Sequence, residues 1–203
     1  MMKQLTAFCV ATILCLNASP VTNAQGNSEA TNLARQGSEA AKASDWTKAI
    51  EFFRKAAEMD RKWASNLAAA LQQRGAANMS QQKFQEAAAD FSEALTINPR
   101  DAGIHERRAY VEMKLNDFDK ALADYSDAIK INPREIRYYL LRSYIYETKG
   151  DVKNSMADTE HVLKMDKNNA EAHARQERLK KIETLKANAP GPTPIPQPPP
   201  KKK

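Results

Sequence analysis

The feature of this sequence that most restricts its fold is a phrase that returns after 34 residues. The stretch FSEALTINPRD begins at Phe91, and YSDAIKINPRE begins at Tyr125. The match extends toward the N-terminus, where FQEAAAD leads into the first phrase and FDKALAD into the second. A self-similar period of this length is typical of proteins in which one supersecondary unit stacks on the next. The echo therefore predicts a building block, not an active site.

The same register continues on both sides of these two copies. One small residue occupies the same slot in every copy: Ala49, Ala87, Ala121 and Ser155. Four copies are predicted, over residues 30–63, 68–101, 102–135 and 136–169. Four additional residues, 64–67, separate the first copy from the second. They add roughly one helical turn, so we expect the next helix to begin near Trp63.

Small and aromatic residues recur at two further slots. The first holds Gly37, Gly75, Ala109 and Ser143, and the second holds Phe53, Phe91, Tyr125 and Thr159. Small residues let two antiparallel helices approach closely, and an aromatic ring fills the gap between one hairpin and the next. This pattern resembles the tetratricopeptide repeat, a helix-turn-helix unit of 34 residues, and the resemblance covers about two thirds of the chain.

The resemblance implies an all-α fold. It would be a right-handed α-solenoid of about four tetratricopeptide helix-turn-helix repeats over residues 25–188, with a C-terminal cap helix at 170–188 that solvates the end of the stack. Asn98 and Asn132 are expected to end helices in the left-handed conformation, and the proline after each to launch the next helix. The phrase INPR is thus interpreted as the joint between hairpins.

The N-terminal segment, residues 1–24, has the layout of a secretory signal peptide. A lysine in MMKQ precedes the apolar run LTAFCVATILCL, and VTNA ends in small residues. The run is short for a membrane span, and we expect cleavage between Ala24 and Gln25, with an uncleaved membrane anchor as the alternative. Both cysteines, Cys9 and Cys15, lie in this segment. The predicted location is extracytoplasmic: a bacterial periplasm or, alternatively, secreted or membrane-anchored.

The C-terminal segment, residues 189–203, is predicted to be a disordered, proline-rich tail. PGPTPIPQPPPKKK contains seven prolines and cannot form a helix or a core. Its terminal lysines contribute three charges to a formal net charge of +6 and could contact anionic envelope components. A PxxPxK ligand for a proline-recognition domain is the alternative. Because an exported chain seldom meets nucleic acid, we do not expect nucleic-acid binding.

Catalytic signatures are absent from the sequence. It contains no HExxH, CxxC, GxSxG, GxGxxG or phosphate-binding loop, so we expect neither an enzyme nor a cofactor or metal site. The repeat register puts His105 and His173 in a packing slot of the first helix, and His161 stands alone on a second helix. Acidic residues such as Asp90 are expected on solvated helix faces.

A binding groove follows from the resemblance, which implies a concave wall lined mainly by first-helix residues. The residues assigned to a partner-binding groove are Arg107, Tyr110, Lys114, Arg137, Tyr144 and Arg175. The same slots also place on this wall Arg35, Lys42, Gln72, Gln73, Met79, Glu106, Met113, Leu141 and Arg178. Arginine can bind carboxylates in a bidentate manner and tyrosine supplies rigid contact area, so an acidic protein segment is the expected partner. Solvated helix faces with partly packed tyrosines are the alternative interpretation.

These patterns predict a non-enzymatic adaptor or scaffold that binds a partner segment in an extracytoplasmic compartment. The resemblance does not extend to the set of lysine, asparagine and arginine residues by which some members of the family clamp chaperone C-termini, so that partner is not expected. The alternative function is structural assembly or envelope tethering through self-association or the basic tail. Neither the partner nor the oligomeric state follows from the sequence.

Overall fold

A computed structural model describes residues 20–188, with side chains from Gly26 onward. The described residues form α-helices and one short 3-10 helix, with no strand among them, which confirms the predicted all-α helical repeat fold. The described chain divides into two compact units, at the boundary between Trp63 and Ala64. The tail at 189–203 and most of the predicted signal segment lie outside the described residues.

The first unit is a single helical hairpin. Helix α1 (Pro20–Lys42) packs against α2 (Trp46–Met59), which leads into the 3-10 helix η1 (Arg61–Trp63). Gly37 faces the ring of Phe53 so closely that a Cβ atom there would lie 3.0 Å from it. Helix α1 begins ten residues before the predicted start of the first copy at residue 30 and runs through the predicted cleavage position. The cleavage stays a prediction.

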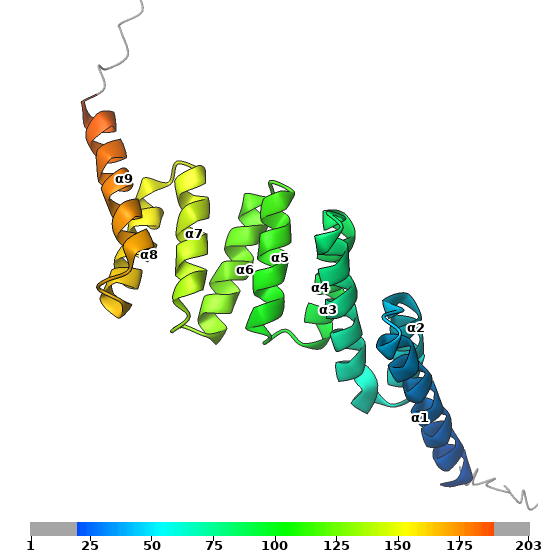
Figure 1. The fold of residues 1–203 in the computed structure, drawn as a ribbon. Helices are drawn as coiled ribbons and strands as arrows, with labels where there is room; N and C mark the ends of the chain where they lie inside the picture. The colour runs from blue at the N-terminus through cyan, green and yellow to red at the C-terminus, as the bar shows by residue number, and fades with distance from the viewer. Residues whose placement is uncertain (1–19, 189–203) are drawn as a thin grey trace, which may run out of the picture. The chain divides into compact units, whose positions relative to one another are not determined.

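The second unit contains three helical hairpins and a final helix. Its helices are α3 (Ala64–Ser80), α4 (Phe84–Ile97), α5 (Ala102–Lys114), α6 (Phe118–Ile131), α7 (Ile136–Thr148), α8 (Val152–Met165) and α9 (Ala170–Ala187). Helix α3 begins next to Trp63, as predicted. Within this unit the first helices α3, α5 and α7 form one layer with α9, and α4, α6 and α8 form the layer behind it (Figure 1).

The turns inside the hairpins carry the left-handed residues of the chain. Ser44, Gln82, Asn116 and Gly150 all have positive φ, one residue before the N-cap of a second helix in each hairpin. The prediction that Asn98 and Asn132 end helices in the left-handed conformation is wrong. Their φ angles are −127° and −124°. The cause is the proline after each, whose ring restricts the preceding residue to extended conformations.

The aromatic slot lies in the core, as predicted. The side chains of Phe91 and Tyr125 are fully buried. In the last hairpin the slot holds Thr159 instead, and its hydroxyl lies 2.9 Å from the Ser143 hydroxyl. Ser143 also lies 3.0 Å from the hydroxyl of Ser155, so three buried hydroxyls bond to one another where the other hairpins place a ring. Each of these three buried hydroxyls therefore has a hydrogen-bond partner.

A ladder of buried ion pairs runs through the second unit. An arginine of the first helix donates to an aspartate of the second helix 16 residues later, in three successive hairpins: Arg74 to Asp90, Arg108 to Asp124 and Arg142 to Asp158. The three aspartates are 3–6% exposed. The expectation of a solvated Asp90 is therefore wrong. Its carboxylate is buried because the Arg74 guanidinium and the Asn78 amide satisfy it.

At one position of the first helices, the side chain forms a hydrogen bond with a backbone carbonyl in the joint that precedes the helix. A side chain in this slot reaches the carbonyl six residues earlier in three repeats: His105 to Pro99 (3.2 Å), Tyr139 to Pro133 (3.1 Å) and His173 to Lys167 (2.8 Å). His105 is buried, as expected for a packing position, whereas His173 is exposed, so the packing prediction is wrong for it. α9 ends the stack, and no further described helix covers this slot.

Candidate functional site

A cavity of the second unit lies beside the first-helix layer and has a volume of about 840 Å³. The α3–α4 turn region, helix α5 and the first turn of α7 supply its lining: Met79, Ser80, Gln82, Phe84, Glu106, Arg107, Tyr110, Lys114 and Arg137. Four of the six residues assigned to a groove from the sequence thus line one cavity, together with Met79 and Glu106 of the wider predicted wall.

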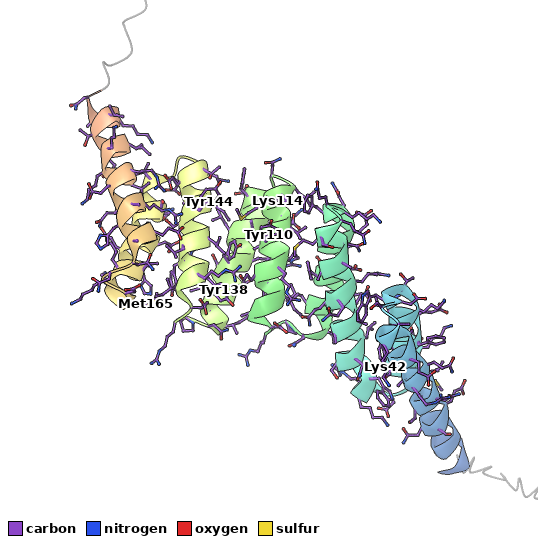
Figure 2. The ribbon with its side chains drawn as sticks, viewed as in Figure 1. Lys42, Tyr110, Lys114, Tyr138, Tyr144 and Met165 are labelled. Carbon is purple, nitrogen blue, oxygen red and sulfur yellow. The ribbon has the colours of Figure 1, made fainter. Side chains whose placement is uncertain are left out.

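Helix α5 contributes a stripe of three side chains to this cavity. Arg107, Tyr110 and Lys114 are spaced by three and four residues, which places them on one face of a helix. Tyr110 is 42% exposed, and the Lys114 ammonium lies 5.2 Å from the centre of its ring. Figure 2 shows Tyr110 and Lys114 along α5, with Tyr144 on the neighbouring α7. The stripe offers a rigid aromatic surface with a cation at each end.

An ion pair joins the two helices that border the cavity. The Arg137 guanidinium of α7 lies 3.0 Å from the Glu106 carboxylate of α5. The Glu106 side chain is 20% exposed, whereas that of Arg137 is 69% exposed. Among the described residues, Arg107 and Lys114 have no carboxylate partner. The cavity therefore contains one neutralised pair and two uncompensated positive charges.

Two buried tyrosines, Tyr125 and Tyr138, feel the charge of Glu106. Burial raises the pKa of Tyr125, and the negative charge of Glu106 raises it further. Burial likewise raises the pKa of Tyr138, again with a contribution from Glu106. The Tyr125 hydroxyl faces the Met113 sulfur at 3.9 Å. Both tyrosine hydroxyls stay neutral at physiological pH. Among the residues that line the cavity, Glu106 is the one acidic residue.

The two other assigned groove residues lie elsewhere. Tyr144 is 46% exposed on α7 but does not line the cavity. Arg175 is only 3% exposed, so its assignment to an open wall does not agree with the structure. Its guanidinium donates to the Leu140 carbonyl at 2.6 Å and to Glu171 at 3.0 Å. The cause is the packing of α9 against α7 and α8, which uses the charge of Arg175 to attach the final helix.

The cavity residues that the sequence did not assign come from the hairpin turn. Ser80, Gln82 and Phe84 lie at the end of α3 and the start of α4. Gln82 has a φ of 60° in the turn that reverses the chain from α3 into α4. Sequence reasoning had restricted the wall to first helices. The signal that could have identified them is their place in the turn of a hairpin, because this turn lies beside the first helix of the next hairpin.

The described residues contain no group of three histidine, cysteine or acidic residues that could hold a metal ion. Nor is any helix between residues 20 and 188 long and apolar enough to span a membrane.

Comparison with known proteins supports the repeat assignment. Two family models, both described as tetratricopeptide repeat, match residues 78–144 and 136–169. The matched residues therefore run from the end of α3 through α8 and include the residues that line the cavity. No curated protein matches the sequence.

Solved structures show the same fold. The tetratricopeptide domain of OM64 from Arabidopsis is 24% identical, with a TM-score of 0.54, over 59% of this chain and 98% of that one. The first such domain of Spaghetti (RPAP3), bound to the HSP90 peptide SRMEEVD, is 22% identical, with a TM-score of 0.53, over 58% and 93%. YrrB, described as a protein with an unusual peptide-binding site, is 17% identical, with a TM-score of 0.59, over 83% and 84%. At these identities the likeness concerns the fold alone.

Proposed function

We propose that this chain, which contains tetratricopeptide repeats, is a non-enzymatic adaptor that holds a segment of a partner protein in the cavity beside α5. One observation carries the proposal. Arg107, Tyr110, Lys114 and Arg137, which the repeat register assigned to a groove, come from two different hairpins and line one cavity of about 840 Å³. A cavity of this size takes several side chains of a peptide.

The chemistry of the cavity favours an acidic segment. Arg107 and Lys114 carry charges that no described carboxylate neutralises, and Tyr110 presents an exposed ring between them. Arginine and tyrosine are enriched among the residues that dominate binding energy at protein interfaces. Similar folds bind peptides: one of the matched structures contains an HSP90 peptide, and another is described by its peptide-binding site.

Site-specific cross-linking tests the proposed groove. A benzophenone amino acid is placed at Tyr110, inside the cavity, and at Lys130, an exposed position on α6 in the other helix layer. Ultraviolet irradiation of producing cells and mass spectrometry of the adducts then identify what lies at each position. We expect the position of Tyr110 to give an adduct with one contiguous segment of one protein, and the position of Lys130 to give none. No adduct at Tyr110, or the same adducts at both positions, would overturn the proposal.

The proposal includes an extracytoplasmic location, supported by the signal-peptide layout of residues 1–24. The chain is purified from fractionated producing cells and its N-terminus is determined by mass spectrometry. We expect the extracytoplasmic fraction to contain a chain that begins at Gln25. A chain that begins at Met1 in the cytoplasmic fraction would show that this part of the proposal is wrong, while the groove would stand on its own test.

A further inference from the structure

The stripe on α5 has a definite length. Arg107 and Lys114 are seven residues apart, and at a rise of 1.5 Å per residue their Cα atoms are about 10 Å apart along the helix axis. Tyr110 lies between them with 42% of its surface exposed. A ligand that lies along this stripe therefore meets the charge of Arg107 and then the Tyr110 ring, with the Lys114 ammonium 5.2 Å from the centre of that ring.

The other lining residues restrict where each part of a ligand can bind. Met79 and Phe84 border the same cavity as Tyr110 and add apolar surface to it. Arg137 is already neutralised by Glu106 at 3.0 Å, so a ligand carboxylate gains less there than at Arg107 or Lys114. The preferred positions for negative charge are thus the two ends of the α5 stripe.

We infer that the partner segment presents one bulky apolar side chain flanked by two carboxylates on the same face. Alternate side chains of an extended chain share a face, so the acidic residues stand two positions before and two positions after the apolar residue, about 13 Å apart at about 3.3 Å per residue, which the long side chains of Arg107 and Lys114 can span. This inference rests on the proposed function and adds the pattern that the cavity selects. The apolar side chain packs against Tyr110, Met79 and Phe84, and the carboxylates pair with Arg107 and Lys114. Burying the ring and the apolar side chain removes water from both ion pairs and strengthens them.

Three kinds of segment do not fit the cavity. A basic segment meets two uncompensated cations and is repelled. An acidic segment without a bulky apolar residue leaves Tyr110, Met79 and Phe84 exposed to water and loses the hydrophobic part of the binding free energy. A single chain-terminal carboxylate can occupy one end of the stripe only. A chain terminus therefore fits only where an acidic side chain of the same segment supplies the second carboxylate.

Selection from a displayed library of random twelve-residue peptides tests the pattern. The library is bound to the immobilised 203-residue chain at about 0.15 M salt, where exposed charges are screened beyond roughly 8 Å. We expect the enriched peptides to share a bulky apolar residue with one acidic residue two positions before it and another two positions after it. The enriched peptide is then synthesised and its affinity measured by fluorescence anisotropy for the parent chain and for variants.

Two double variants remove equal charge from different places. Arg107→Gln with Lys114→Gln removes both positive charges of the stripe, and we expect the peptide to bind at least about tenfold more weakly. Lys130→Gln with Arg134→Gln, on exposed positions of α6 and the turn after it, should change the affinity less than about twofold. Melting temperatures measured by circular dichroism verify that both variants fold.

The outcomes separate this inference from the proposed function. Enriched peptides without the acid–apolar–acid pattern, or equal losses in the two double variants, would overturn the inference while peptide binding itself stands. No enriched peptide at all would overturn the proposed groove together with the pattern.

Discussion

Arg108 donates two hydrogen bonds to the carboxylate of Asp124, from Nε to Oδ2 at 2.8 Å and from Nη2 to Oδ1 at 2.7 Å. Its third nitrogen, Nη1, donates at 3.1 Å to Ser92 on α4 of the preceding hairpin. One guanidinium therefore joins the two helices of its own hairpin and attaches that hairpin to the one before. The same arrangement returns 34 residues later with Arg142, Asp158 and Ser126.

Asp124→Ala should lower the free energy of unfolding by about 3 kcal/mol, because removing one partner of a buried ion pair leaves the other charge unsatisfied. Asp124 also lies 2.8 Å from the ring nitrogen Nδ1 of His105, which loses its partner as well. Urea denaturation followed by circular dichroism measures the change. Asp127→Ala is the control: its side chain is 45% exposed in a surface pair with Lys130, so the cost should be less than about 1 kcal/mol. Equal losses would show that the ladder does not hold the hairpins together.

Gly75→Ala tests the close approach of the helices in the first hairpin of the second unit. Alanine is the better helix former by about 1 kcal/mol, which alone would stabilise α3. However, the new Cβ atom would lie 2.9 Å from the fully buried ring of Phe91. Because a buried ring has no free space into which to move, we expect the melting temperature to fall.

Gly26→Ala, made like Gly75→Ala in the 203-residue chain that keeps residues 1–24, is the control for this prediction. Gly26 is also helical, and nothing lies within 4 Å of a Cβ atom added there. Its melting temperature should stay the same or rise slightly. A rise in both variants would mean that Phe91 and its neighbours yield at little cost, and that glycine at this slot is not required by packing.

The repeat period predicted the helices because it combines many weak signals into one register. Once Ala87 and Ala121 were aligned, the buried rings of Phe91 and Tyr125 followed by position alone. Arg107 and Tyr110, assigned through the resemblance, line one cavity, and their role as a groove stays a prediction. These positions depend on the backbone geometry that every repeat shares, and that geometry is what a sequence period records.

The charged residues were harder to predict, because a side chain's partner is set by neighbouring helices. Asp90 was expected in solvent although an arginine precedes it by 16 residues, and the same pair recurs at Arg108 and Asp124. That recurrence was a usable signal in the sequence. Arg175 carried no such signal. Its burial depends on how α9 ends the stack, and only the structure shows Leu140 as its acceptor.

Tyr110→Ala and Tyr144→Ala test the groove with a pair of equivalent residues. The two tyrosines occupy the same repeat slot, 34 residues apart, and are 42% and 46% exposed. Only Tyr110 lines the cavity. For a peptide selected on the parent chain, we expect Tyr110→Ala to weaken binding about tenfold, as for an aromatic residue at the centre of an interface, and Tyr144→Ala to change it less than about twofold. Fluorescence anisotropy measures both affinities. Comparable losses would place the peptide across both tyrosines instead of within the cavity.

Glu112 gives the second unit a dependence on pH. It is 6% exposed on α5 and lines a smaller cavity of about 340 Å³ together with Arg108 and Lys120. Burial raises the pKa of Glu112 above its ordinary value of 4.5. The positive charges of Lys120 and Arg108 lower this pKa, whereas the negative charges of Asp117 and Asp124 raise it further. The net direction is upward, so the folded state binds the proton more tightly than the unfolded chain does.

A folded-state pKa above the unfolded value means that the free energy of unfolding decreases as pH rises from about 4.5 through the folded pKa. Glu112→Gln removes the titrating charge but keeps the shape of the side chain. We expect the variant to melt at a higher temperature than the parent chain near pH 8, and at nearly the same temperature near pH 4, where Glu112 is protonated in both states. Glu86→Gln, on an exposed face of α4, controls for the loss of one negative charge. A melting temperature for Glu112→Gln that is lower than the parent's near pH 8 would show that the ionised carboxylate is stabilising, through Lys120 or Arg108, and would contradict the prediction.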